Sequence, residues 1–178
     1  EIIDATIECN TSLNVRNLYG GCNQADVKPN GSQHGDVHLK VYGGHFENVY
    51  GGSKGSVPPE NATPEQLADA SADISGDVTL EIFGGVIDTI FGGSNINGNV
   101  AGKITVNIMK NGECDFEVHN VYGGGRDAAY TPTTPGAYPE VNIINGTISH
   151  KEVNGHHTGG NVFGGGYGES AVVASNHL

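Results

Sequence analysis

Four segments of the chain alternate apolar and polar residues with a period of two. They span residues 35–41, 76–82, 102–108 and 140–143, and the sequence GDVHLKV of the first is typical of them. This alternation predicts β-strands with one buried face and one solvated face, and valine and isoleucine dominate the buried positions. The predicted core consists of Val37, Leu39, Val41, Val78, Leu80, Ile82, Ile104, Val106, Ile108, Val141 and Ile143.

A glycine-containing turn and a second, shorter strand follow each alternating segment. The turns contain Gly-Gly or Asn-Gly pairs, which tolerate a positive φ, as at residues 43–44 and 111–112. The second strands, such as residues 46–50 and 87–91, end in an aromatic residue followed by two glycines. One repeat therefore contains two strands and two glycine-rich corners.

The repeats become clear when the closing aromatic residues are aligned. These aromatic residues stand at positions 19, 50, 91, 122 and 163, at intervals of 31 or 41 residues. Repetition on this scale is typical of solenoids, propellers and arrays. The pattern predicts an all-β, single-stranded parallel β-helix, a β-solenoid of about four to five coils, formed by residues 1–178 as one repeat domain of a longer protein.

A recurring Asn or Thr two residues before each aromatic residue predicts a structural ladder of side chains. It is occupied by Asn17, Asn48, Thr89, Asn120 and Asn161. In parallel, in-register strands these side chains would lie roughly 4.8 Å apart, and each amide could bond to the next. The blades of a propeller would gain nothing from this match, so the ladder favours stacked repeats.

Longer insertions follow three of the closing motifs. Residues 54–75 contain the helix signal of the chain, with Thr63 as N-cap, Pro64 at the first helical position and Gln66 completing a capping box. We expect a short helix over residues 64–72 in this corner insertion. Residues 23–34 and 126–139 are expected to be irregular loops. Stacking would bring all three insertions out along one edge, which is the predicted binding edge.

Composition and charge narrow the classes of partner. The chain has 178 residues, 29 of them glycine, and a net charge of −12. Scattered basic residues in an acidic protein argue against binding of nucleic acid or anionic lipid. The sequence contains no run of about 18 apolar residues, so we expect no membrane insertion in this segment. The cysteines Cys9, Cys22 and Cys114 lack metal-binding spacing, and the predicted stack places Cys114 three coils from the others, so we expect three free thiols.

The closing motifs VYGGS and VYGGG, together with openings such as GDVTLEI, resemble the glycine-rich parallel β-helix repeats of adhesin-like surface proteins of gut bacteria. The resemblance covers about residues 5–168. It implies a right-handed β-helix, secretion, and an extracellular or cell-surface location. Such motifs are stacking devices, so they specify fold much better than activity.

Acidic residues on the outward strand face are candidates for chemistry. Asp36 and Asp77 are expected to stack one coil apart, near the ~5 Å separation of a retaining glycosidase pair. His38, Lys40 and Glu81 share that face, and these five residues form the candidate binding set. Against catalysis, the outward columns mix Asp, His, Lys, Thr, Asn and Glu, with no aromatic platform for sugars. An ordinary solvated face is the preferred interpretation.

The other motifs do not predict a phosphate-binding or metal-binding site. The glycine pairs lack the lysine and helix of a phosphate-binding loop, and His156 and His157 lack a convincing third ligand. We therefore expect no catalytic residue, metal or cofactor. The sequence predicts a non-enzymatic, adhesin-like surface module whose rigid scaffold presents an edge to a glycan or host protein. The alternatives are a carbohydrate-active enzyme, either a polysaccharide lyase or a glycosidase, and a purely structural fibre segment.

Overall fold

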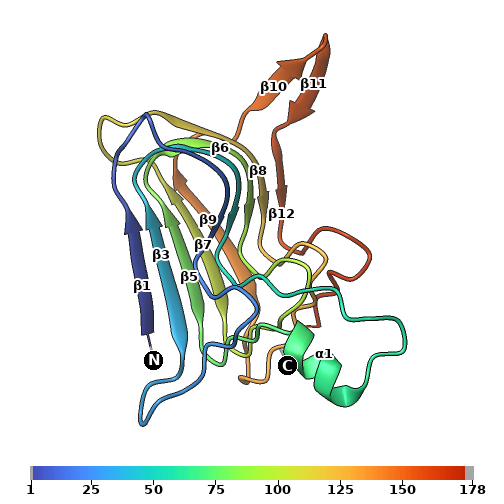
Figure 1. Cartoon of the computed structure of the whole chain (residues 1–178). Helices are drawn as coiled ribbons and strands as arrows, with labels where there is room; N and C mark the ends of the chain where they lie inside the picture. Colours follow the sequence, from blue (N-terminus) through green and yellow to red (C-terminus); the bar gives the residue numbers. More distant parts are fainter. Residues whose placement is uncertain (1, 175–178) are drawn as a thin grey trace.

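The computed structural model describes residues 2–174, and its regular secondary structure is mostly parallel β-strands joined by loops (Figure 1). The first sheet contains β1 (Ile2–Ile7), β3 (Asp36–Val41), β5 (Val78–Ile82), β7 (Ile104–Met109) and β9 (Pro139–Asn145). The second sheet contains β2 (Asn14–Tyr19), β4 (His45–Tyr50), β6 (Gly85–Phe91), β8 (Phe116–Tyr122) and β12 (Asn161–Phe163). Consecutive strands of the chain thus alternate between two five-stranded sheets.

This two-sheet arrangement corrects the predicted single-stranded β-helix. Each repeat contributes one strand to each sheet, and equivalent strands pair in parallel with their neighbours. The repeat pattern predicts this parallel pairing, because equivalent apolar positions are buried best when they lie beside one another. It does not determine how the two strands of a repeat are joined in space, and that was the step at which the solenoid prediction was wrong.

The core lies between the two sheets. From the first sheet it receives the alternating valine, leucine and isoleucine side chains, and Leu39, Leu80 and Val106 are fully buried. From the second sheet it receives side chains such as Val49 and Ile90. Nine of the eleven predicted core residues are buried, whereas Val141 is half-buried and Ile143 is 44% exposed. Both exceptions belong to β9, which pairs with β7 and has no strand on its other side within residues 2–174.

The predicted helix is present as α1 (Pro64–Ala70), two residues shorter than expected. The Thr63 side chain accepts a hydrogen bond from the Gln66 backbone N–H, and the Gln66 side chain accepts one from the Thr63 N–H. This reciprocal capping box satisfies two backbone donors at the helix start. The helix lies in a loop beside the two sheets (Figure 1). A separate antiparallel hairpin, β10 (His150–Val153) and β11 (His156–Gly159), projects away from them (Figure 1).

A disulfide joins Cys9 and Cys114 across a Cα–Cα distance of 6.1 Å, so the prediction of three free thiols is wrong; Cys22 is free. The loop that carries Cys114 passes over the turns of two intervening repeats at Gly43 and Gly84. A Cβ atom on Gly43 would lie 3.0 Å from the Cys114 Sγ atom, and one on Gly84 would lie 3.2 Å from the Cys114 Cβ atom. Because both residues lack a side chain, the loop can reach back to Cys9.

Candidate functional site

Five aromatic rings form a continuous column along the second sheet. The rings of Tyr19, Tyr50, Phe91, Tyr122 and Phe163 stack with centroid separations of 4.8, 5.0, 5.1 and 4.8 Å and nearly parallel planes. These separations follow from strand geometry, because in-register parallel strands place equivalent residues about 4.8 Å apart. Each ring comes from the closing motif of one repeat, so the motif that organises the sequence also builds this column.

The asparagine positions lie beside the aromatic column in the order that the sequence predicts. Strand pairing aligns Asn17 with Asn48, then Thr89, Asn120 and Asn161. The Asn48 amide donates to Asn17 over 2.9 Å, and the Asn161 amide donates to Asn120 over 3.0 Å. Thr89 interrupts the ladder, and the Asn120 amide donates to the Asp88 carbonyl over 3.3 Å. The ladder thus has two amide pairs with a hydroxyl between them.

A third line of residues covers the other side of the rings. It lies four positions after each aromatic residue and is joined from repeat to repeat by parallel bridges. Its members are Asn23, Lys54, Asn95, Arg126 and Tyr167. Asn95 donates to the Tyr19 hydroxyl over 2.9 Å, and the Tyr167 ring meets the edge of Tyr122 at a centroid distance of 5.5 Å. These loop residues therefore form a wall opposite the ladder.

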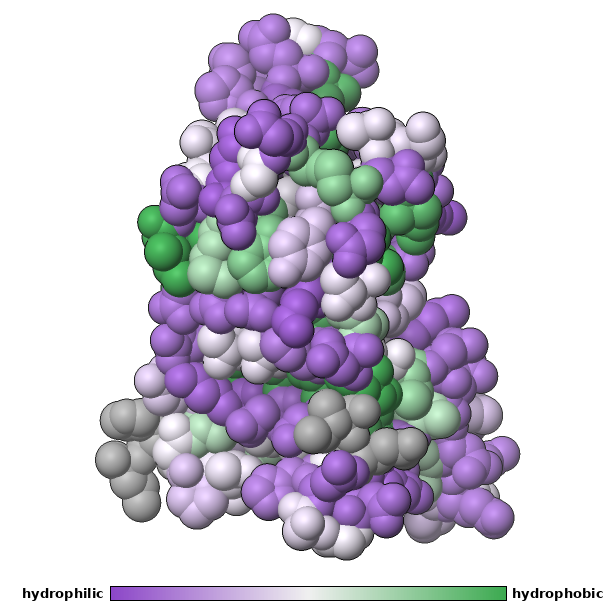
Figure 2. Space-filling model, turned by 90° about the vertical axis from the view of Figure 1, so that its left-hand side faces the viewer, coloured by the Kyte–Doolittle hydropathy of each residue, from purple (hydrophilic) through white to green (hydrophobic). Residues whose placement is uncertain are grey.

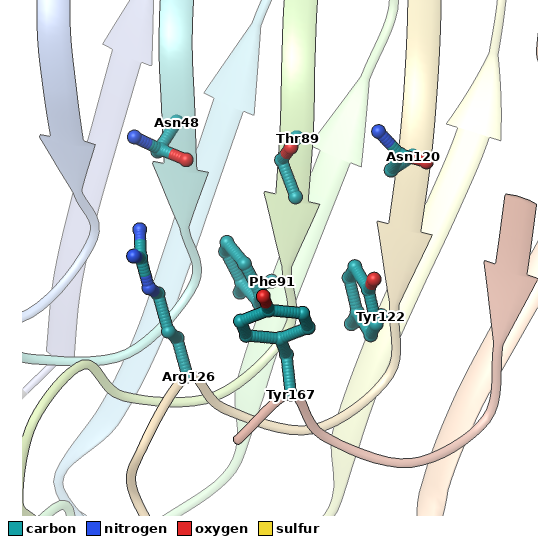
Figure 3. Close-up of a pocket in the computed structure, with 7 residues that line it drawn as sticks. All are labelled: Asn48, Thr89, Phe91, Asn120, Tyr122, Arg126 and Tyr167. Atoms are coloured by element: carbon teal, nitrogen blue, oxygen red, sulfur yellow. The ribbon is translucent and has the colours of Figure 1, made fainter. Parts of the chain in front are cut away.

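Two adjoining hollows run between the ladder and this wall, and we call them together the aromatic groove. The first, of about 260 Å³, is lined by Asn48, Thr89, Phe91, Asn120, Tyr122, Arg126 and Tyr167 (Figure 3). The second, of about 270 Å³, is lined by Arg16, Asn17, Asn48, Tyr50, Asn95, Ile96, Arg126 and Asp127. Asn48 and Arg126 line both hollows, so they mark the place where the two meet.

Arg126 is the centre of positive charge in the groove. Its guanidinium lies beside the Tyr50 hydroxyl, and this contact raises the pKa of Arg126. This contact does not have the geometry of a normal hydrogen bond. Among the described residues, the buried Tyr50 hydroxyl has no hydrogen-bond partner. The Arg126 side chain is 42% exposed, and its Nε atom lies 3.8 Å from an Asp127 carboxylate oxygen. A ligand entering the groove would therefore meet a cation with free donor capacity.

Tyr50 and Tyr122 of the groove are neutral hydrogen-bonding groups at ordinary pH. Burial raises the pKa of Tyr50, and it also raises the pKa of Tyr122. A phenol whose pKa lies above its usual value near 10 keeps its proton and can donate a hydrogen bond. The groove thus combines apolar ring edges with amide, hydroxyl, phenol and guanidinium groups.

The predicted binding set lies elsewhere, on the outward face of the first sheet. His38 Nε2 and Glu81 Oε2 are 2.6 Å apart, and Lys40 Nζ lies 3.7 Å from an Asp4 carboxylate oxygen. Asp36 accepts a hydrogen bond from the Asp77 backbone N–H over 2.8 Å. These residues are near neighbours, but their described contacts tie one repeat to the next.

Asp77 repeats the role of Asp36 one repeat further along the sheet. Its carboxylate accepts a hydrogen bond from the Lys103 backbone N–H over 2.7 Å. Beyond it, the Lys103 ammonium pairs with Glu140, which raises the pKa of Lys103 and lowers the pKa of Glu140. Asp36, Asp77, Lys103 and Glu140 thus connect each repeat to the next near the start of the strands.

The sequence analysis considered an aromatic platform only on the outward columns of the first sheet and did not predict the aromatic groove, which lies on the second sheet. The available signal was the aromatic residue at a fixed place in every closing motif, followed four positions later by Asn, Lys, Asn, Arg or Tyr. Strict alternation along the second strand would have placed Asn48 and Tyr50 on the same face as the buried Phe46. Instead Phe46 and Val49 are both buried, three residues apart, and the intervening irregularity turns Asn48 and the buried Tyr50 toward the groove.

Metal-binding arrangements are absent from residues 2–174, in which no three His, Cys, Asp or Glu side chains gather as a cation site would require. His150 and His157 do meet edge to face, with ring centroids 4.4 Å apart, on the β10–β11 hairpin. The same residues contain no helix long and apolar enough to cross a membrane.

Comparison with known proteins gives no relative: no family model, no curated protein and no solved structure matches the chain. Function must therefore be inferred from the residues of the groove.

Proposed function

We propose that this protein is a non-enzymatic module, displayed outside the cell or on its surface, that binds a glycan chain in the aromatic groove. The observation that carries the proposal is the combination, in one open trough, of stacked aromatic rings, a line of amides and hydroxyls, and an exposed arginine. The adhesin-like role is the one implied by the resemblance of the repeats, and the groove supplies a physical means of recognition.

The chemistry of the groove suits a sugar. A pyranose presents apolar C–H faces together with hydroxyl groups on its rim, so it needs both apolar surface and precisely placed polar partners. The exposed Tyr167 ring provides apolar surface, while Asn48, Thr89 and Asn120 provide donors and acceptors in a row. Arg126 adds a planar donor that can bind two oxygens at once.

The shape of the groove favours a chain over a single sugar. Two hollows join at Asn48 and Arg126, and the equivalent residues repeat at the spacing of neighbouring strands. That spacing is comparable to the length of one sugar unit in an extended polysaccharide. Successive sugars could therefore meet successive repeats.

The disulfide supports an extracellular location. Cys9 and Cys114 are joined although 105 residues separate them in the sequence. Structural disulfides persist in oxidising environments and are rare in the reducing cytosol. The disulfide therefore agrees with secretion, which the resemblance of the repeats also implies.

The placement of the acidic residues favours binding over catalysis. Asp36 and Asp77 both accept backbone hydrogen bonds from the next repeat, so their described contacts are structural. Within the groove, the carboxylate of Asp127 lies beside Arg126. A glycosidase requires one carboxylic acid that holds its proton and a second carboxylate across the scissile bond.

A glycan array combined with turnover assays on the same glycans tests the proposal. We expect retention of one class of glycan without release of shortened products. Tyr167→Ala should then raise the dissociation constant about tenfold or more, because it removes the exposed ring of the groove. The matched control is Tyr138→Ala, which removes an exposed tyrosine in the loop just before β9 and should leave affinity unchanged.

Other outcomes would assign a different function. Release of shortened products would replace the binding module by an enzyme, and silence in both assays would favour a structural segment. If Tyr167→Ala kept full affinity while Glu81→Gln abolished it, the outward face of the first sheet would carry the binding.

A further inference from the structure

Two residues of the wall opposite the ladder each reach a tyrosine hydroxyl of the aromatic column, but only one of the two contacts is closed. Asn95 donates a hydrogen bond to the Tyr19 hydroxyl over 2.9 Å. Arg126 and Tyr50 are the equivalent residues of the next repeat. In this second pair the guanidinium lies beside the hydroxyl without a normal hydrogen bond. Equivalent positions thus make a closed contact with asparagine and an open contact with arginine.

The Tyr50 hydroxyl is a buried polar group that lacks a hydrogen-bond partner. Tyr50 is fully buried, and its hydroxyl is unpartnered in the described part of the chain. The ring is stacked between Tyr19 and Phe91, at centroid distances of 4.8 and 5.0 Å, so the hydroxyl cannot turn toward another partner. Native proteins leave few buried polar groups unsatisfied. Because Tyr50 lines the second hollow of the groove, a ligand bound there can supply the partner.

Arg126 has unused donors beside this hydroxyl. A guanidinium carries five N–H donors and no acceptor. The Arg126 Nε atom is 3.8 Å from an Asp127 carboxylate oxygen, which is beyond hydrogen-bond distance, and the Cζ atom is 5.9 Å from the centre of the Tyr167 ring. Figure 3 shows the side chain extending from its loop, beside Phe91, toward Asn48. The guanidinium is therefore available to a ligand in the groove.

Both groups require an acceptor from the ligand. Arg126 can only donate, and Tyr50 keeps its proton because burial raises its pKa. A carboxylate offers two coplanar oxygens that match the planar guanidinium and can accept a further hydrogen bond from the phenol. A neutral sugar hydroxyl is a poorer match, since hydrogen bonds between charged groups are about twice as strong as neutral ones.

The neighbouring residues of the groove limit the ligand to one negative charge at this place. The wall positions on either side of the guanidinium are Asn95 and Tyr167, which are neutral. The carboxylate of Asp127 lines the second hollow and would repel a second anion. The other arginine of that hollow, Arg16, already pairs with Glu47 over 3.1 Å. An acidic sugar with neutral neighbours therefore fits better than a run of acidic sugars.

The rest of the molecule also disfavours a densely charged ligand. The chain has a net charge of −12, and the face shown in Figure 2 is mostly hydrophilic. A uniform polyanion binds through many basic contacts at once. A groove with one open guanidinium suits a glycan whose carboxylates are isolated from one another.

We propose that the aromatic groove binds an acidic glycan, in which the carboxylate of one uronic acid unit accepts hydrogen bonds from Arg126 and Tyr50 and the adjoining units are neutral. This inference rests on the proposed glycan-binding function and names the class of its ligand. The Tyr50 hydroxyl is enclosed, so its bond to the carboxylate requires the guanidinium beside it to shift. Asn48 lines both hollows with Arg126 and is placed to bind hydroxyl groups of the same sugar.

An array of paired hexasaccharides tests the inference. Each uronate-containing hexasaccharide is compared with the same hexasaccharide after reduction of its carboxylates to primary alcohols. The wild-type protein should bind the acidic member of a pair at least about tenfold more tightly. Arg126→Gln should abolish this preference by weakening binding of the acidic member. The control Lys28→Gln removes the same charge from the loop between β2 and β3 and should keep the preference.

Tyr50→Phe separates a binding role of the hydroxyl from a structural one. Phenylalanine keeps the ring in the column, as it does naturally at position 91, and removes the unpartnered hydroxyl. The melting temperature should therefore equal or exceed that of wild type, while the affinity for the acidic member should fall about tenfold. A lower melting temperature with unchanged affinity would assign the hydroxyl a structural role and overturn its part in the site.

The outcomes distinguish this inference from the proposed function. Equal binding of both members of each pair, still weakened by Tyr167→Ala, would overturn the acidic ligand and leave glycan binding in the groove intact. Binding of no glycan on the array would overturn both. A sulfated hexasaccharide without carboxylates that bound as tightly as the acidic members would overturn the assignment of a carboxylate. Tighter binding of a uniform uronate polymer would overturn the neutral neighbours.

Discussion

Leu80→Asp is expected to destabilise the protein by more than about 3 kcal/mol. Leu80 is fully buried at the centre of the first sheet, between Leu39 on β3 and Val106 on β7. An aspartate there would lose its hydration without gaining a charged partner, and the shorter side chain would leave a void in the core. Urea unfolding followed by circular dichroism measures the loss.

The neighbouring residue provides the matched control. Thr79 lies on the same strand and is partly exposed, because successive side chains point to opposite faces. Thr79→Asp should therefore cost no more than about 1 kcal/mol. If both aspartate variants lowered stability equally, Thr79 would be as buried as Leu80 and the assignment of the two faces would be wrong.

Replacing Cys9 and Cys114 together by serine is expected to cost about 2–5 kcal/mol. The disulfide closes a loop with a sequence separation of 105 residues, and cross-links across long loops restrict the unfolded chain most. It also ties the turn after β1 to the turn before β8, so its removal should release the loop that carries Cys114. The same unfolding measurement should show the loss.

Cys22→Ser is the control for this variant, since Cys22 is free and only partly buried. It should change the free energy of unfolding little. Mass spectrometry after thiol labelling of the unfolded, unreduced protein should find Cys22 labelled and the other two cysteines joined. Labelling of all three cysteines would contradict the cross-link.

The strands and their buried faces could be predicted well from the sequence. Alternation is a local property, so Val37, Leu80 and Ile108 were assigned to the core correctly. The helix could also be predicted, because its start depends on the local contact between Thr63 and Gln66. Ile143 has the same alternation, but among the described residues no strand lies on the outer side of β9, so its exposure could not be predicted from its own segment.

The path of the chain between repeats could not be predicted in the same way. The sequence determines that equivalent strands stack, but the two-sheet arrangement depends on how the connections run in space. The disulfide shows the same limit. Counting repeats placed Cys114 far from Cys9, whereas its loop crosses over Gly43 and Gly84 to reach Cys9.

The groove was hidden for a physical reason. A residue's face on a strand follows from alternation only while the strand stays regular, and the irregularity between Phe46 and Val49 reverses the face of Asn48 and Tyr50. Arg126 and Tyr167 reach the groove from loops, which the strand pattern does not place. The charged residues around Asp36 and Asp77 were easier to find, but their described contacts are structural.

The position of a bound oligosaccharide in a crystal of the complex tests the central claim most directly. With a glycan selected on the array, we predict electron density for the sugar along the aromatic groove, between the row formed by Asn48, Thr89 and Asn120 and the wall formed by Arg126 and Tyr167. Density over the outward face of the first sheet, beside His38 and Glu81, would contradict the claim and show that this face is the binding site.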